Sequence, residues 1–413
     1  MEILSADVLV IGGGFSAQMA VITLMRLTQN KQLNIVMATP AMSDRDCLPL
    51  NLPDQDISWE KRYQDTIRAG AGQCDPELTG ILCQEGPDML EKLTQAGIDR
   101  DCDQQALSAE LYNLTYTREK RLTALRLFVR DGRVQGALCA DNRHGFAAVS
   151  AGTVLLANGG YGEIYRSSPI VGSMGDAIGM AFYAGAAMAD LEFVFFPPQT
   201  KAESDGWTPI TLGGLIVDSQ CRTGVSGLYA AGGCTAGIHG AGLIPGNEIL
   251  SALVFGKLAG QAIAQADRLP GADAGMLNAW AEEILPLGSH DLEEKMKHIR
   301  ADMESAMRSG AGPVREQSSI EAALQTVSRL QHELNELPPC PEDQWFFRLR
   351  LENDLIAARL TLLSSLERRE SVGVYRRSDH PEKAESPYRV QLQLNGLLLF
   401  PEKEAWHGAA SLP

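Results

Sequence analysis

The chain lacks any pair of cysteines at the spacing of a metal or redox site. Its eight cysteines are scattered, and no two stand in a C-x-x-C arrangement. Iron–sulfur clusters and structural zinc ions are usually held by closely spaced cysteines, so the usual spacings for both are excluded. Scattered, unpaired cysteines are typical of a reducing compartment, and we expect a cytoplasmic protein. If electrons pass through this chain, no cysteine-bound metal centre of its own carries them.

Other absences limit location and partners. No apolar run reaches the length of a membrane span, and the first expected strand begins too early to leave room for a signal peptide. Positive charge is scarce, with 36 Lys and Arg against 52 Asp and Glu, so the net charge is −16. This acidity argues against nucleic acid or an anionic membrane surface as the main partner. A chain of 413 residues is long enough for two or three domains.

The N-terminal stretch carries the clearest motif. Four apolar residues, 8–11, predict a buried parallel strand that runs directly into Gly12-x-Gly14-x-x-Ala17 and an apolar helix over 18–27. The first glycine permits a tight turn, the second lets the backbone approach a pyrophosphate, and the small third residue lets the helix pack on the strand. Free N–H groups at the start of that helix would bind the diphosphate. The pattern predicts a dinucleotide-binding unit.

Hydrophobic periodicity predicts the remaining elements. Strands are expected at 34–38, 153–160, 227–233 and 390–394, helices at 58–71, 76–96, 119–126, 175–187 and 249–267, and a hairpin over 127–138 turned at Asp131-Gly132. Residues 275–370 are strongly helical, with 321–337 and 346–369 predicted as an antiparallel pair around Pro338-Pro339. A carboxylate often follows the second strand of a dinucleotide-binding unit to hold the ribose, but here only Thr39 or backbone is available.

Several stretches together resemble the flavoprotein subunits of the succinate dehydrogenase and fumarate reductase family, which includes L-aspartate oxidase. The matching pieces are the glycine motif at 12–17 and the stretches 156–161, 174–181, 184–187, 191–194, 213–218, 227–232, 239–241, 246–247 and 370–381. The resemblance implies an α/β fold. It comprises a Rossmann-like FAD-binding domain over 1–270 with a helical insertion at about 55–125, a helical domain over 275–370 and a tail over 371–413. It also implies an FAD-dependent oxidoreductase.

The resemblance also implies a set of FAD-binding residues. These are Gly12, Gly14, Ser16 and Ala17 at the pyrophosphate, Thr39 near the adenosine ribose, Ala157, Gly159 and Gly160 along the dinucleotide, and Asp176, Gly232, Gly233, Asn247 and Ile249 towards the ribityl chain and isoalloxazine. Two matches differ, because Gly233 stands where the family usually has a ribityl-binding Glu, and Glu248 replaces the usual Ser. The loop that carries a flavin-linking His in some members is here 44–50. No histidine lies between residues 1 and 143, so we expect non-covalent FAD.

The dicarboxylate-binding part of the family pattern is mostly missing. Pro197-Pro198-Gln199 replaces a His-Pro-Thr triplet, Pro209 replaces a second substrate-binding His, and Leu243 replaces a carboxylate-binding Arg. The family's capping domain, with its proton-donating Arg, is reduced to residues 200–212. A dicarboxylate needs fixed cations, and hydride transfer to a C=C bond needs a nearby proton donor. We therefore do not expect succinate or fumarate as substrate.

Two candidate catalytic residues remain, His239 and Arg377. His239 matches a family position beside the flavin, with a turn residue bonded to backbone as the alternative interpretation. Arg376 and Arg377 could supply positive charge to the vacated pocket, with surface salt bridging as the alternative. Cys234 follows a glycine turn, where a small buried residue is favoured over a redox thiol.

Two functions of different class follow from these observations. The main prediction is an FAD-dependent oxidoreductase that acts on an unknown substrate in a pocket opened by loss of the cap. The alternative is a flavin-bearing electron-transfer or assembly subunit of a multi-protein redox complex. In either case a flavin without a cap needs cover from water. We expect an iron–sulfur or haem partner protein, or a second copy of the chain, to provide that cover.

Overall fold

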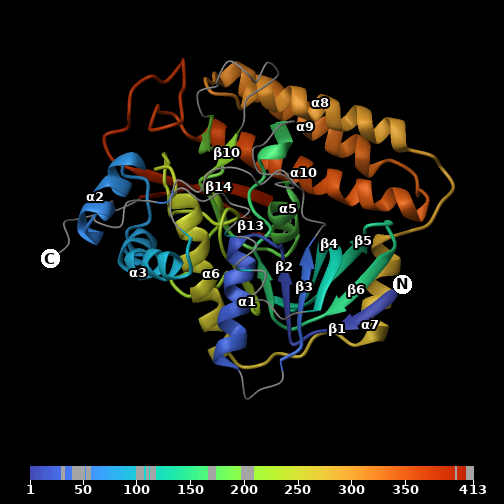
Figure 1. Ribbon diagram of the computed structural model, residues 1–413. Coiled ribbons are helices and arrows are strands. Elements are labelled where there is room, and N and C mark those ends of the chain that lie inside the picture. The colour runs from blue at the N-terminus through green and yellow to red at the C-terminus, as the bar shows by residue number, and fades with distance from the viewer. Residues whose placement is uncertain are drawn as a thin grey trace.

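The computed structural model describes residues 1–28, 33–39, 52, 57–98, 107, 111, 118–165, 174–196, 209–395 and 398–405. At its centre is an eight-stranded sheet in the order β1-β6-β5-β4-β3-β2-β7-β12 (Figure 1). The strands are β1 (Glu2–Ser5), β2 (Val8–Ile11), β3 (Ile35–Thr39), β4 (Arg118–Arg130), β5 (Arg133–Asp141), β6 (Phe146–Ser150), β7 (Val154–Leu156) and β12 (Leu228–Ala230). Strands β3, β2, β7 and β12 are mutually parallel, so their carboxyl ends meet at one edge.

Two helices pack side by side at this parallel part of the sheet, and the first of them packs directly on β2. They are α1 (Phe15–Leu27) and α6 (Asn247–Gln265), which lie next to each other in Figure 1. Their backbones approach closely because Gly256 faces the backbone of Ser16 and Gly260 faces that of Ala20, leaving no room for a Cβ at either glycine. The strand–glycine–helix unit predicted at the N-terminus is confirmed, with β2 bounded as expected.

Helices α2 (Trp59–Ala69) and α3 (Pro76–Gln95) pack on each other, and α3 also packs on α6. Both begin at capping residues that the sequence supplies. The Ser58 side chain accepts a hydrogen bond from the Lys61 N–H, and the Asp75 carboxylate accepts from the N–H groups of Glu77 and Leu78. Such caps satisfy backbone donors that have no partner within the helix.

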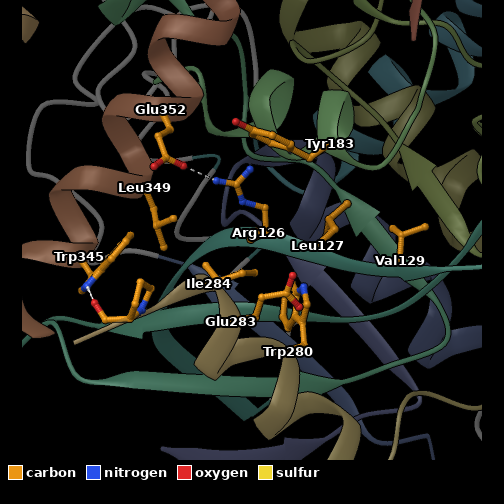
Figure 2. Close-up of a pocket in the computed structure, with 11 residues that line it drawn as sticks. Arg126, Leu127, Val129, Tyr183, Trp280, Glu283, Ile284, Trp345, Leu349 and Glu352 are labelled. Carbon is orange, nitrogen blue, oxygen red and sulfur yellow. Dashed lines mark hydrogen bonds and ion pairs between the residues drawn. The ribbon is translucent and has the colours of Figure 1, made fainter. Parts of the chain in front are cut away.

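The C-terminal half supplies α7 (Ala274–Ile284), α8 (Glu293–Gly310), α9 (Gln317–Asn335) and α10 (Glu342–Glu367). Helices α8, α9 and α10 pack on one another, which confirms the predicted antiparallel pair. Helix α10 is buried along most of its length because it also covers α5 (Asp176–Tyr183) and β4. Side chains of β4, α7 and α10 face one another in the region drawn in Figure 2. No helix within the described ranges combines the length and apolar character needed to cross a membrane.

A second sheet joins the two halves of the chain, in the order β11-β8-β13-β14. It consists of β8 (Met188–Ala189), β11 (Gly214–Leu215), β13 (Tyr388–Asn395) and β14 (Leu398–Ala405). The short strands β9 (Val194–Phe195) and β10 (Ile210–Thr211) pair separately, and a 3-10 turn, η1, spans Gly162–Tyr165. Because β13 pairs with β8, the C-terminal segment returns to the region just before the expected substrate site.

The fold class is as predicted from the sequence, with one wrong element. The helix expected at 119–126 is part of strand β4, which pairs with both β3 and β5. Arg, Lys, Glu and Leu favour a helix locally, but pairing in the centre of a sheet overrides that weak preference. The hairpin turn at Asp131-Gly132 is confirmed, and both residues have positive φ (53° and 70°), as a two-residue type I′ turn requires. The helix predicted at 175–187 is shorter and ends at Tyr183.

Candidate functional site

Glycines line the carboxyl edge of the parallel strands. At some of these positions the backbone conformation or the lack of space for a Cβ requires glycine. Gly12 ends β2 with φ +118°, and its N–H donates to the Ala38 carbonyl oxygen at 2.8 Å. A Cβ at Gly12 would collide with the carbonyl of Ala157 at the end of β7. Only glycine therefore lets the chain turn at this point between two strands.

Gly14 has a different reason to be glycine. It is exposed, its φ is −74°, and a Cβ built on it would meet nothing within 4 Å. It is also the N-cap of α1, and no side chain caps this helix end. The first N–H groups of α1 therefore have no side-chain acceptor from the cap, and they carry the positive end of the helix dipole. This end of the helix suits a diphosphate.

The ends of the neighbouring strands complete the edge. The Thr39 side chain at the end of β3 lies against Gly13, where a Cβ would strike its hydroxyl. Gly159, after β7, has φ +80° and open space around the position of a Cβ. Gly232, after β12, is in contact with the Ser16 hydroxyl, and Gly233 lies beside the Gly160 N–H. The structure thus brings most of the predicted FAD residues to one edge, with backbone atoms presented where side chains would otherwise stand.

Several polar side-chain atoms around this edge and the start of α6 are buried without a hydrogen-bond partner among the described residues. They are Asn158 Oδ1, His239 Nδ1, Asn247 Oδ1 and Glu248 Oε2. Buried polar atoms are rarely left unpaired, because each loses its hydrogen bonds to water. Hydroxyl and amide groups of a bound dinucleotide are suitable partners for such atoms. The residues present therefore fit a polar, phosphate-bearing cofactor.

His239 lies beside the N-terminal turn of α6. Its Nε2 is 3.5 Å from the Ser251 hydroxyl, which itself donates to the Glu248 carbonyl oxygen at 2.9 Å. Burial lowers the pKa of His239 to about 4, so the imidazole is neutral at pH 7. Burial also raises the pKa of the neighbouring Glu248 carboxyl. His239 can therefore give or accept a hydrogen bond, but it does not supply a positive charge.

The Asp176 carboxylate is held by the long helix α10. One oxygen forms an ion pair with Arg350 at 3.1 Å, and the other accepts a hydrogen bond from the Asn353 amide at 3.1 Å. The sequence analysis did not predict a role for Arg350 and Asn353. Their polar side chains within a largely buried helix are the feature that could have indicated one.

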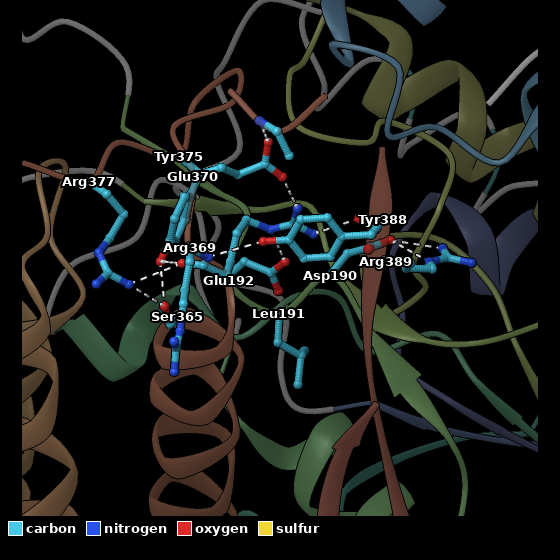
Figure 3. A network of polar contacts seen from close by, with 12 residues as sticks. Asp190, Leu191, Glu192, Ser365, Arg369, Glu370, Tyr375, Arg377, Tyr388 and Arg389 are labelled. Atoms are coloured by element: carbon cyan, nitrogen blue, oxygen red, sulfur yellow. Dashed lines mark hydrogen bonds and ion pairs between the residues drawn. The ribbon is translucent and has the colours of Figure 1, made fainter. Parts of the chain in front are cut away.

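Arg377 is fully engaged in the C-terminal segment (Figure 3). Its guanidinium forms two hydrogen bonds to Asp379, at 2.7 and 2.6 Å, and donates to the carbonyl oxygens of Ser365 and Arg368. These contacts favour a structural role for Arg377 over a catalytic one. Cys234 is buried, and burial raises the pKa of its thiol to about 12, which favours a packing role.

A network of buried charges holds the segment before the expected substrate site (Figure 3). Arg368 forms ion pairs with Glu192 at 2.6 Å and with Glu370 at 2.7 Å, and Arg389 pairs with Asp190 at 2.8 Å. Asp190 has φ +62°, which is unusual for a residue with a side chain. The buried arginines of this network are matched by carboxylates of the same chain, so their charge is already balanced.

The region expected to bind substrate is apolar where the structure describes it. Phe193, Leu212, Ala241, Val372 and Tyr375 form a small core, and half-buried Leu243, Ile210 and Phe195 pack against it. Thr211 accepts a hydrogen bond from the Tyr161 N–H and lies against Gly160, so this cluster adjoins the glycine edge. Pro209 is buried. Other predictions rest on residues 44–50, Pro197-Pro198-Gln199 and 200–208. These residues lie outside the part of the chain that the structure describes.

Comparison with known proteins agrees with this geometry. A family model described as FAD binding domain matches residues 7–119, 104–206 and 204–249, and a second, described as Fumarate reductase flavoprotein C-term, matches residues 300–394.

Individual proteins are similar along nearly the whole chain. One subunit of the fumarate reductase (CoM/CoB) of Methanothermobacter marburgensis is 25% identical over 527 aligned positions, covering 92% of this chain and 95% of the relative. L-Aspartate oxidase of Streptomyces coelicolor is 24% identical over 549 positions, covering 95% and 92%. Among solved structures, a chain of E. coli quinol fumarate reductase superposes with a TM-score of 0.83 at 17% identity, covering 100% of this chain and 98% of that one.

Proposed function

The chain belongs to the FAD binding domain family and is an FAD-dependent oxidoreductase related to fumarate reductase flavoproteins and L-aspartate oxidases, and from this premise we propose that its substrate is a neutral, largely apolar molecule rather than a dicarboxylate. The observation that carries this proposal is Leu243, which packs into an apolar cluster at a position where the resemblance predicts a carboxylate-binding arginine. Bound FAD would supply hydride transfer, and this chain would supply the binding surface around it.

The cofactor would be held mainly by backbone. The N-terminus of α1, from Gly14 to Ala17, would bind the pyrophosphate, and Thr39, which lies against Gly13, would contact the adenosine ribose. The turns after β7 and β12 would follow the dinucleotide. Asn247 and Glu248 at the start of α6 offer unpaired buried oxygens, and these support binding of the ribityl chain and ring nearby.

The mode of FAD attachment can be tested directly. We expect the purified protein to be yellow and acid precipitation to release all of its flavin as FAD, because no histidine precedes residue 144. Absorbance spectra of the supernatant and pellet are the measurement. Flavin that stays in the pellet would contradict non-covalent binding, and a colourless protein that cannot be reconstituted would contradict FAD binding by this chain.

The substrate proposal rests on charge around the apolar cluster. His239 is neutral at pH 7 because its pKa is lowered to about 4. The buried arginines closest in sequence to the cluster residues, Arg368 and Arg377, are paired with carboxylates. Alignments to the relatives span 527 and 549 positions, which exceeds the 413 residues of this chain and supports the absence of a segment that those proteins carry. Arg315 lies over the Tyr375 ring, 4.5 Å from its centroid, and donates to the carbonyl oxygens of Glu192 and Ala311. One buried cation adjoins the cluster, whereas a dicarboxylate brings two charges that need balancing when it leaves water.

Succinate and its dimethyl ester form a matched pair of probes, because they share a carbon skeleton and differ in charge. We expect the ester, and not succinate, to perturb the visible spectrum of the bound flavin on titration. We further expect that Leu243→Arg introduces succinate binding, whereas Leu243→Met does not, because methionine keeps the volume without adding charge. Steady turnover of succinate or fumarate by the unmodified protein would contradict the proposal.

A second function, electron transfer within a complex, is supported by the name of one relative, which is a subunit. In this function a partner polypeptide would cover the flavin face near residues 197–212. The partner would be an iron–sulfur or haem protein, or a second copy of this chain. The two functions are compatible, because a covered flavin can both oxidise a substrate and pass electrons onward.

A further inference from the structure

A cavity of about 480 Å³ lies between strand β4 and the helices α5, α7 and α10 (Figure 2). None of its 11 lining residues is among the predicted FAD residues. Leu127 and Val129 of β4, Ile284 of α7 and Leu349 of α10 give it apolar walls. A volume of this size is within the range of small-molecule binding sites, which are mostly apolar with a few placed polar groups.

Three aromatic rings line this cavity, and each is held by the protein. The Tyr183 ring lies over the guanidinium of Arg126, 3.6 Å from centroid to Cζ. Trp280 packs on Phe128 with ring centroids 4.8 Å apart, and the Trp345 indole N–H donates to the Pro286 carbonyl oxygen at 3.1 Å. Rings held in this way lose little freedom when a ligand binds, which favours affinity.

The charges around the cavity are unequal. Arg126 and Glu352 form an ion pair at 2.7 Å, and their side chains are only 10% and 17% exposed. The other oxygen of Glu352 lies 3.7 Å from Arg348 Nε, so the charge of this carboxylate is fully compensated. Glu283 also lines the cavity, is exposed, and has no ion pair or hydrogen bond with any residue that the structure describes. It lies one helical turn after Trp280, so the carboxylate and the indole occupy the same face of α7.

We propose that this cavity binds an organic cation with a flat apolar body, such as an aromatic amine, whose ammonium group lies against Glu283. The apolar body would contact the walls formed by β4 and Trp280. An ammonium group is attracted both by a carboxylate and by the faces of aromatic rings. A ligand of the same shape with a carboxylate in place of the ammonium would be repelled by Glu283.

The test uses 2-phenylethylamine and 3-phenylpropionate, which have similar size and opposite charge. Isothermal titration calorimetry on the FAD-loaded protein at moderate salt measures both. We expect the amine to bind with a stoichiometry of one and the acid to bind about tenfold more weakly or not at all. Equal affinity for the two probes, or no heat with the amine, would overturn the proposal.

Variants at two adjacent glutamates separate a specific site from general attraction to an acidic protein. Glu283→Gln keeps the shape of the cavity and should weaken amine binding several-fold. Glu282→Gln removes the same charge from the preceding residue of α7, which is exposed and does not line the cavity, and should leave the affinity unchanged. Equal losses in both variants would mean that the cation is attracted only by the net charge of −16, and would overturn the proposal.

Trp280→Leu provides an independent check on the aromatic wall. We expect it to weaken binding of the amine because a cation–aromatic contact and apolar area are lost together. The flavin spectrum and the thermal midpoint of each variant report whether the fold is retained. If Trp280→Leu retains the fold and full affinity, the ligand does not lie against this wall and the proposed site is wrong.

Discussion

At the scale of single residues, the predicted FAD site at the carboxyl edge of the parallel strands depends more on the absence of side chains than on their presence. Gly12 needs a backbone conformation that other residues rarely adopt, whereas Gly14 adopts an ordinary conformation beside open space. The two glycines of one motif are therefore required for different reasons, the first by the fold and the second by the expected ligand. Substitution by alanine should distinguish these reasons.

Gly12→Ala is expected to destabilise the protein by about 2 kcal/mol or more, because φ is +118° and the new Cβ collides with Ala157. Gly14→Ala should leave the thermal midpoint of the FAD-free protein unchanged and reduce FAD affinity. Thermal melts with and without added FAD measure both effects. Gly80→Ala, in helix α3 and facing open space, is the control for an alanine substitution without steric consequence. A Gly14→Ala protein that binds FAD normally would place the pyrophosphate elsewhere.

His239 makes a second residue-scale prediction, which concerns pH. Burial lowers its pKa from an ordinary 6.5 to about 4 in the folded state. Between these values the unfolded chain binds more protons than the folded chain, so this residue makes the protein less stable as pH falls from about 6.5 to about 4. His239→Gln should reduce the loss of thermal midpoint between pH 7 and pH 5. The exposed His290→Gln is the control, and equal behaviour of the two variants would mean that His239 titrates normally.

At the scale of elements, the buried ion pairs tie the end of α10 and the C-terminal segment to the residues that precede β9. Arg368 is fully buried between Glu192 and Glu370, and its Nη2 also donates to the Tyr388 carbonyl oxygen at 3.2 Å. A single guanidinium thus joins the end of α10 and the start of β13 to Glu192, which is 176 positions away in the sequence. Removing it leaves two buried carboxylates without their cation.

Arg368→Met should destabilise the protein by roughly 3–5 kcal/mol, the usual cost of breaking a buried ion pair from one side. Adding Glu192→Gln should recover part of the loss, because one unpaired charge is then removed. Urea denaturation of the single and double variants measures the coupling. Lys297→Met, which breaks an exposed ion pair on α8, should cause no measurable change. If Arg368→Met behaves like Lys297→Met, the network of Figure 3 does not hold these segments together.

At the scale of the whole molecule, the remaining question is what covers the flavin. A reduced flavin exposed to water would lose electrons to oxygen, and the segment from 200 to 212 is too short to form a domain of its own. We expect native mass spectrometry of the protein from its own cells to show either a complex with a redox protein or a dimer. A lone monomer whose flavin is nevertheless protected from a soluble quencher would contradict both forms of cover.

The class of fold and the positions of the glycine turns could be predicted from the sequence alone, because both depend on local patterns. A run of apolar residues ending in Gly12 specifies a buried strand and its turn, and the spacing of Asp131-Gly132 specifies a hairpin. The replacement of family residues by Pro209 and Leu243 could also be identified from the sequence, because it depends only on residue identity.

Features that depend on contacts between distant segments could not be predicted from the sequence. Residues 119–126 form part of a strand because β3 and β5 lie on either side of them, not because of their own preference. Asp176 is held by Arg350, 174 positions away in the sequence, and Arg377 also donates to the end of α10, so these contacts are not determined by a local motif. The cavity beside Glu283 likewise brings together residues from β4, α5, α7 and α10. Charge pairing and cavity shape depend on distances in space, and spacing along the chain does not determine those distances.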